Sequence, residues 1–219
     1  MTIQAVVFDF DGVIADSEPL HLDAYRALLA PLGIDLDQAT YCERYLGYDD
    51  EGALRKMAED FGLRLDGGEI ERLIVEKGRV FEGLLGTRDV LYPEAAECVR
   101  RLAAAWPVGV ASGALRADID LVLRGTGLQH FFRFIVAAGD TAQTKPAPDP
   151  YLRAADLHAV APSACVAIED SHWGLESARA AGMRTIAVTH TYPRESLTGH
   201  ADRVVDSLAE ITRDLVAQL

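Results

Sequence analysis

Short apolar runs recur along the whole chain, and they limit most strongly what it can fold into. They are rich in β-branched and aromatic residues and occupy residues 3–8, 108–111, 134–138, 165–168, 185–188 and 203–205. Between most of them lie segments with the apolar spacing of a helix, such as Ala95, Cys98, Val99 and Leu102 after Pro93. Strands that are apolar on both faces and alternate with helices predict an α/β fold, a Rossmann-like parallel sheet sandwiched by helices.

One interval breaks this alternation. From Ser17 to Thr87 the patterns are helical and no convincing strand occurs, although a crossover between parallel strands needs only about a dozen residues. We predict an inserted α-helical cap domain over residues 17–87 and a catalytic α/β core formed by 1–16 and 88–219. The insertion leaves the sheet just after the first strand, on the side where open α/β sheets bind ligands.

Composition narrows the classes of partner and compartment. The formal net charge of −13 on 219 residues argues against nucleic acid and anionic membranes, because their binders usually carry a basic face. The three cysteines lack metal-ligand or redox-motif spacing, and neither a secretory signal nor a membrane-spanning run is evident. We predict a cytoplasmic protein; its oligomeric state is not fixed by the sequence, and a monomer is compatible with it.

Polar residues follow four of the predicted strands at the point where each strand ends. They are Asp9-Phe10-Asp11-Gly12 after the first, Ser112-Gly113 after the second, Lys145 in the loop after the third, and Glu169-Asp170 after the fourth. Because the carboxyl ends of parallel strands share one edge of the sheet, these side chains are expected to converge.

This set of side chains suits phosphoryl transfer. The Asp9 carboxylate can attack a phosphoryl group and hold it as an acyl phosphate. Attack by one anion on another needs a hard divalent cation, and Mg²⁺ prefers oxygen ligands. Asp9, the backbone carbonyl of Asp11, and Asp170 would supply these oxygens, with Glu169 adding negative charge. Lys145 would neutralise the nucleophile and the transferred group.

Ordinary structural roles compete with each of these assignments. Asp9 and Asp11 can be turn residues before Gly12, and Lys145 can be a solvated surface lysine. Ser112, whose hydroxyl could hold phosphoryl oxygens together with neighbouring backbone N–H groups such as that of Gly113, can instead be a helix N-cap or turn residue. Helix capping is a further role open to Asp170 and Ser171.

Four segments in order strengthen the functional interpretation. FDFDGVIADSEPLH, ASG, TKPAPDPYL and EDSHWGLESARAAGM resemble the motifs of the haloacid dehalogenase superfamily, in its β-phosphoglucomutase-like and phosphoglycolate-phosphatase-like branch with a helical cap. The resemblance implies an aspartyl-phosphate intermediate. It also implies that the Asp11 carboxyl protonates the leaving oxygen and then deprotonates the attacking water.

Two candidate substrate-binding residues lie on predicted cap helices. Lys77 stands in the middle of an otherwise apolar stripe on residues 69–85, so its charge must either snorkel to solvent or face something polar. His21 shares a helical face with Tyr25 and Leu28. The resemblance implies substrate contact for both residues, but a packing role for His21 is equally open.

A third candidate, Gly47, marks a departure from the mutases. These enzymes usually carry an arginine after a glycine in the cap, to grip the distal phosphate of a bisphosphate. The comparable stretch here, Gly47-Tyr48-Asp49-Asp50, is acidic, and two anions are not comfortably held beside it.

We therefore predict a Mg²⁺-dependent phosphatase for a small phosphorylated metabolite, a sugar phosphate or similar. A phosphomutase of the β-phosphoglucomutase type, an isomerase, is the alternative. A phospho-accepting receiver-type signalling domain is a more distant alternative, because receivers are much shorter and lack a cap.

Overall fold

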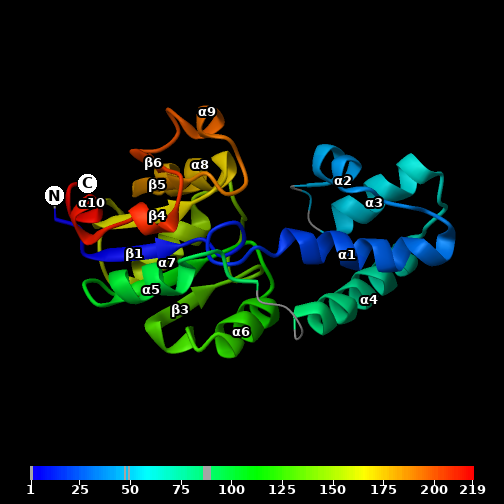
Figure 1. Ribbon diagram of the computed structural model, residues 1–219, viewed down its shortest axis with the longest axis horizontal. Coiled ribbons are helices and arrows are strands. Elements are labelled where there is room, and N and C mark those ends of the chain that lie inside the picture. The colour runs from blue at the N-terminus through cyan, green and yellow to red at the C-terminus, as the bar shows by residue number, and fades with distance from the viewer. Residues whose placement is uncertain (1, 47, 49, 86–89) are drawn as a thin grey trace. The chain divides into compact units, whose positions relative to one another are not determined.

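The computed structural model describes residues 2–46, 48, 50–85 and 90–219. The chain forms two compact units (Figure 1): a core made of Met1–Asp16 and Val90–Leu219, and a cap made of Ser17–Asp89. The interval without predicted strands thus folds as a unit of its own.

The core contains a six-stranded parallel sheet in the order β3-β2-β1-β4-β5-β6. Its strands are β1 (Ala5–Phe8), β2 (Val108–Ala111), β3 (Phe132–Val136), β4 (Cys165–Glu169), β5 (Arg184–Val188) and β6 (Arg203–Val205). The chain extends the sheet from β1 toward β3 on one side, then crosses to β4 on the other. The loops after β1 and β4 therefore lie at the switch point where open parallel sheets bind ligands.

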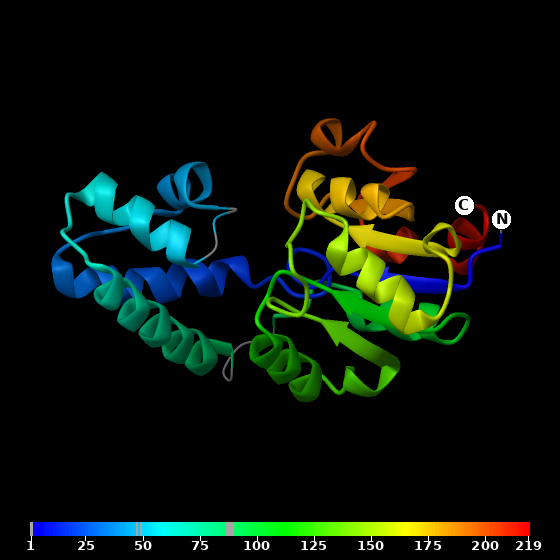
Figure 2. The ribbon, with the colours of Figure 1, turned by 180° about the vertical axis from the view of Figure 1, so that it is seen from behind.

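Helices cover both faces of this sheet, with α5 on one face and α7 and α8 on the other (Figures 1 and 2). The core helices are α5 (Ala95–Ala103), α6 (Arg116–Gly125), α7 (Asp149–His158), α8 (His172–Ala180), α9 (Arg194–Leu197) and α10 (Arg213–Ala217). Short 3₁₀ turns occupy Gln129–Phe131, Pro162–Ala164 and Leu208–Glu210.

The sheet's central strand is apolar at every position because it is covered on both sides. All four residues of β1 are buried. Ala5 and Val7 pack with Tyr151 and Ala154 of α7 and Ala178 of α8. The small alanine side chains let these helices approach the sheet closely, which brings the loop that precedes α7 to the sheet edge.

The predicted fold class is confirmed, with one strand shifted. Residues 134–138 were expected to form a strand, whereas β3 spans Phe132–Val136 and begins with Phe132 opposite Val108. Ala137 leaves the ladder because its N–H is bound by the side chain of Asp140 at 2.8 Å.

The cap is built from α1 (Glu18–Leu29), α2 (Gln38–Arg44), α3 (Asp50–Phe61) and α4 (Gly67–Leu85), with a 3₁₀ turn at Ala30–Leu32. Its own apolar core includes Leu22, Tyr25, Leu54, Met57 and Ile70. Among the described residues of the whole chain, no helix is both long and apolar enough to cross a bilayer.

Candidate active site

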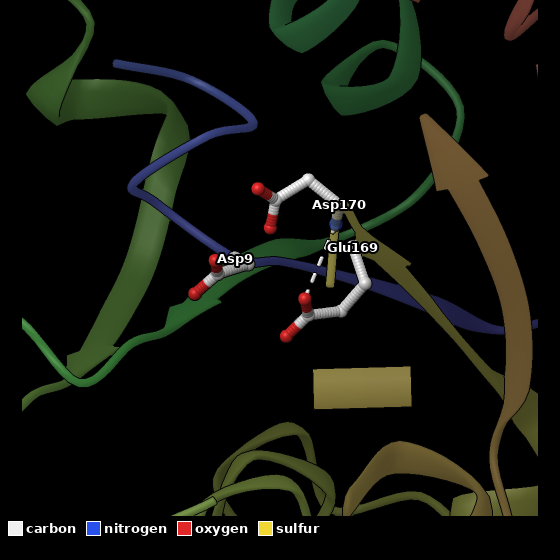
Figure 3. Close-up of side chains that lie close together, drawn as sticks. All are labelled: Asp9, Glu169 and Asp170. Carbon is white, nitrogen blue, oxygen red and sulfur yellow. Dashed lines mark hydrogen bonds between the residues drawn. The ribbon is translucent and has the colours of Figure 1, made fainter. Parts of the chain in front are cut away.

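Three buried carboxylates meet at the carboxyl edge of the sheet (Figure 3). Asp9 follows β1, Glu169 ends β4 and Asp170 follows it. Each offers one oxygen that lies within 4.8 Å of the others, and the residues are only 7%, 0% and 5% exposed. Asp9 is held beside β4 because its N–H donates to the carbonyl of Ile168 at 2.9 Å.

Lys145 joins two of these carboxylates. Its Nζ donates to Asp9 Oδ1 at 2.7 Å and to Glu169 Oε1 at 2.6 Å. Burial alone would lower the pKa of Lys145, but the two carboxylates together raise it above its ordinary value. The two carboxylates therefore favour the charged ammonium, and Lys145 is not a solvated surface lysine.

Glu169 is held by donors from three directions. Besides Lys145, Tyr151 of α7 donates its hydroxyl to Oε1 at 2.7 Å. The other oxygen, Oε2, accepts from the N–H groups of Asp170 at 3.2 Å (dashed in Figure 3) and Ser171 at 3.4 Å, and from the Ser171 hydroxyl at 3.2 Å. A carboxylate this well satisfied is suited to fixing the position of the Lys145 ammonium.

The other two carboxylates lack comparable compensation. Burial is the largest influence on both and raises the pKa of Asp9 well above its ordinary value; Lys145 opposes this shift, while Glu169 and Asp170 add to it. The pKa of Asp170 rises to about 7, through burial and the neighbouring Glu169 charge. With all three carboxylates ionised, the cluster and its one ammonium carry two negative charges in excess, the charge that a divalent cation would balance. The donor set, all oxygen, fits Mg²⁺.

Gly12 allows Asp170 to reach the loop after β1. Its φ of 77° is left-handed, and a Cβ here would collide with the Asp170 carboxylate. Thr191 donates a hydrogen bond to that carboxylate and lowers its pKa. His190 donates from Nδ1 to the Gly12 carbonyl at 2.9 Å. Sequence reasoning missed Thr191 and His190, which follow β5 and belong to no recognisable motif.

Ser112 and Gly113 follow β2, the strand beside β1. Ser112 is buried, and its hydroxyl accepts a hydrogen bond from Ala114 N at 3.0 Å. The N-cap of α6 is Leu115, so Ser112 is a turn residue rather than an N-cap, and its hydroxyl can still donate its own hydrogen. Asp11 is half-buried in the loop after β1, and its backbone forms an isolated parallel β-bridge with that of Ala15.

After β4, Ser171 rather than Asp170 caps the helix that follows. Ser171 is the N-cap of α8, and its hydroxyl accepts from Gly174 N at 3.1 Å. A Cβ on Gly174 would overlap the Glu169 carboxylate. The glycine in this helix therefore makes room for a buried acidic side chain.

A second polar cluster lies within the cap. Lys77 of α4 is 3% exposed; its Nζ donates to Asp50 Oδ1 at 2.6 Å and lies 2.7 Å from His21 Nδ1. Tyr25 donates its hydroxyl to the same Asp50 oxygen at 2.8 Å. Lys77 thus faces polar partners and does not snorkel, and its partner Asp50 was not predicted. Gly47, the remaining cap candidate, lies outside the described residues.

Comparisons with known proteins give this chain a family. Residues 3–182 match the family described as "Hydrolase: haloacid dehalogenase-like hydrolase", and the chain belongs to it. Within this class the chain resembles the CbbY, β-phosphoglucomutase and phosphoglycolate phosphatase branch, as the sequence motifs predicted. The predicted enzyme class, a hydrolase of this superfamily, is confirmed.

Individual relatives cover nearly the whole chain. Protein CbbY of Rhodobacter capsulatus is 31% identical over 100% of both chains. Fructose-1-phosphate phosphatase YqaB of Escherichia coli is 30% identical over 84% of this chain and 95% of its own, and β-phosphoglucomutase of Bacillus subtilis is 30% identical over 98% and 94%. The crystal structure of CbbY from Rhodobacter sphaeroides in complex with phosphate has a TM-score of 0.84 and 28% identity, covering 99% of this chain and 100% of that one.

Proposed function

We propose that this protein is a Mg²⁺-dependent phosphatase that hydrolyses a small phosphorylated metabolite through an aspartyl-phosphate intermediate. The observation that carries the proposal is the Lys145 ammonium bound to both Asp9 and Glu169 among three buried carboxylates. Burying such a cluster destabilises the folded protein unless its charges are paired or bind a ligand. In phosphoryl transfer each carboxylate and the lysine would have a role.

Asp9 is the proposed nucleophile. Its carboxylate oxygen forms a bond to phosphorus while the bond from phosphorus to the ester oxygen breaks. The Asp11 carboxyl donates its proton to that leaving oxygen. In the second step Asp11 takes a proton from water as the water oxygen attacks phosphorus, which releases inorganic phosphate and restores the Asp9 carboxylate.

The surrounding residues hold the phosphoryl group. Lys145 and the Ser112 hydroxyl, with the Gly113 N–H, would bind its oxygens, and Glu169 would keep the Lys145 ammonium in place. Asp9, Asp170 and the Asp11 carbonyl would hold Mg²⁺, with the Glu169 charge beside them. When bound, the ion would supply positive charge to the phosphoryl oxygens.

Residues of the cap would recognise the rest of the substrate. We assign the core, residues 1–16 and 88–219, to chemistry and the cap, residues 17–87, to specificity through His21 and Lys77, with Gly47 as a further candidate. A sugar phosphate or a similar small metabolite fits this division. The name of one relative, fructose-1-phosphate phosphatase, supports that class.

A phosphomutase is the second candidate. The β-phosphoglucomutase of Bacillus subtilis is 30% identical to this chain, as is the fructose-1-phosphate phosphatase of Escherichia coli. The cap's lysine argues for the phosphatase, since Lys77 is already paired with Asp50 and is not available to a second phosphate. Incubation with a hexose 1-phosphate and a bisphosphate primer separates the two: inorganic phosphate indicates the phosphatase, and an isomerised sugar phosphate the mutase.

The decisive experiment measures phosphate release from a panel of sugar phosphates and p-nitrophenyl phosphate. Asp9→Asn should lower kcat by at least about a thousand-fold, as loss of a catalytic nucleophile does, while leaving the circular dichroism spectrum unchanged. Asp156→Asn, on an exposed aspartate paired with Arg153, is the matched control and should retain activity. Chelation with EDTA should abolish turnover and added Mg²⁺ should restore it. Wild-type rates in D9N would remove Asp9 as the nucleophile.

A further inference from the structure

We infer that His190 is a positioning residue for the proposed reaction: its imidazole holds the turn at Asp11-Gly12 in the conformation that the candidate site needs. This inference rests on the proposed function and adds to it a residue from the loop after β5 (Arg184–Val188). Asp11 would supply two groups, its carboxyl for proton transfer and its carbonyl for Mg²⁺. The conformation of this turn therefore decides where both groups lie.

Gly12 does not enforce that conformation by its own sterics. Its φ is 77°, but glycine populates positive and negative φ about equally well, so the turn must be held by other residues. On one side, the Gly12 N–H donates to the Ala15 carbonyl at 2.8 Å. The peptide bond between Asp11 and Gly12 is trans, so the Asp11 carbonyl points the opposite way, away from Ala15.

His190 holds the other side of Gly12. The Gly12 carbonyl lies 2.9 Å from His190 Nδ1, and because a carbonyl can only accept, Nδ1 carries the ring proton. The peptide planes on both sides of Gly12 are thus fixed, the first by Ala15 and the second by His190. Val13 continues the chain from the second plane toward Ala15. The position of the Ala15 carbonyl, and through it that of the Asp11 carbonyl, therefore depends on His190 as well.

The imidazole is itself held by its surroundings. It stacks on the Tyr92 ring, with the ring centres 3.9 Å and the ring planes 16° apart. Tyr92 is anchored because its N–H donates to the Ile14 carbonyl at 3.0 Å. The residue before His190 is fixed too, since the Thr189 N–H donates to the Val205 carbonyl of β6 at 3.0 Å. A donor on a ring fixed in this way is suited to positioning another group.

The next residue, Thr191, connects the same loop to Asp170. Its hydroxyl donates to that carboxylate, and a Cβ on Gly12 would lie 2.9 Å from Thr191 Oγ1. The loop after β5 thus contacts both segments that would supply metal ligands, the turn after β1 through His190 and the residue after β4 through Thr191. Removing a contact that orients metal ligands typically lowers metal affinity or activity by about 10–100-fold.

Two variants separate the hydrogen bond of His190 from the packing of its ring. His190→Phe keeps a ring to stack on Tyr92 and removes the donor, whereas His190→Asn removes the ring and keeps a side-chain N–H donor. H190F should weaken Mg²⁺ binding to the free protein, measured by titration calorimetry, by about ten-fold or more. It should also lower kcat for p-nitrophenyl phosphate by about ten-fold or more, with little change in KM. H190N should stay close to wild type in all three quantities.

His200→Leu, at an exposed histidine, is the matched control and should leave Mg²⁺ affinity and kcat unchanged. A wild-type value of either quantity in H190F would overturn the inference. So would losses in H190N that equal or exceed those in H190F, since they would show that ring packing rather than the hydrogen bond is needed. Should H190F fail to fold by circular dichroism, His190→Leu, which also lacks a donor, takes its place with the same expectation.

Failure of the proposed function has a different signature. Wild-type protein that neither binds Mg²⁺ nor releases phosphate from p-nitrophenyl phosphate would overturn the proposed function, and the role of His190 with it. Mg²⁺-dependent turnover by wild-type protein, together with an unimpaired H190F, would overturn only the role of His190.

Discussion

Buried charged residues in this protein obtain their properties from their partners. Lys145, which is partly buried, and Lys77, which is buried, both bind carboxylates, but their surroundings differ. Lys145 lies among three carboxylates, a cluster left with excess negative charge. Lys77 pairs with one carboxylate and a neutral histidine. The first arrangement suits a cation and a phosphoryl group, and the second suits uncharged polar groups.

The neutral histidine predicts a pH dependence of stability. Because the pKa of His21 falls from 6.5 in the unfolded chain to about 3 in the folded one, between these values only the unfolded chain binds the proton. The free energy of unfolding should therefore fall as pH is lowered through this window, with a slope of up to about 1.4 kcal/mol per pH unit. Urea unfolding of wild type and His21→Asn at pH 7 and pH 5 measures this term.

Because other groups titrate in the same range, only the difference between variants reports on His21. Wild type should lose about 1–2 kcal/mol more than H21N between the two pH values. His200→Asn, at an exposed histidine, should lose as much as wild type. Equal losses in wild type and H21N would show that His21 is protonated in the folded protein.

At the scale of secondary-structure elements, the start of α8 links helix capping to the candidate site. Ser171 caps the helix and also donates to Glu169. Gly174, one turn on, leaves the space that the Glu169 carboxylate occupies. The negative carboxylate at this helix N-terminus is favoured by the helix dipole. The start of α8 thereby holds the Glu169 carboxylate in position, and this carboxylate in turn holds the Lys145 ammonium.

Two of the helical glycines, Gly174 and Gly78, should respond oppositely to alanine. In an open helix position, as at Gly78 where no atom lies within 4 Å of a new Cβ, alanine should raise the free energy of unfolding by about 0.5–1 kcal/mol. At Gly174 the Cβ would displace the Glu169 carboxylate, so alanine should instead cost roughly 1–3 kcal/mol and reduce phosphatase activity. Denaturant titration and phosphate release measure both effects. A gain in stability for G174A would contradict this packing.

At the scale of the whole molecule, charge is distributed unevenly between a strongly acidic surface and the buried cluster. Because the net charge is −13, any salt should screen the repulsion between negative charges of the folded protein. The carboxylates of Asp9, Glu169 and Asp170 should in addition bind a cation specifically. The two contributions can be separated by comparing Mg²⁺ with Na⁺ at equal ionic strength.

Mg²⁺ should stabilise the protein beyond general screening. At about one hundred times its Kd, a ligand that binds only the folded state adds about 2.7 kcal/mol, which for a chain of this size corresponds to roughly 5–10 °C in Tm. Calorimetry in MgCl₂ and in NaCl of matched ionic strength tests this. Asp170→Asn should lose the Mg²⁺-specific part and keep the NaCl response. Identical Tm values for wild type in the two salts would argue against the metal site.

Much of this organisation was predictable from local patterns. Apolar runs at strand spacing and their alternation with helices were sufficient for the parallel sheet, since a strand buried on both faces must be apolar throughout. The polar residues at strand ends identified Asp9, Lys145, Glu169 and Asp170 as candidates, because parallel topology brings strand ends to one edge.

Side-chain partners across the fold were not predictable in this way. By itself the sequence determined that acids and a lysine would gather at one edge of a sheet, because strands that alternate with helices form a parallel sheet whose strand ends share one edge. Only the tertiary structure decided that Glu169 is held by Tyr151 and Ser171, that Thr191 binds Asp170, and that Lys77 is neutralised by Asp50. The residues of such pairs share no periodicity in the sequence. They pair because packing excludes water, and a buried polar or charged group then needs a partner within the protein.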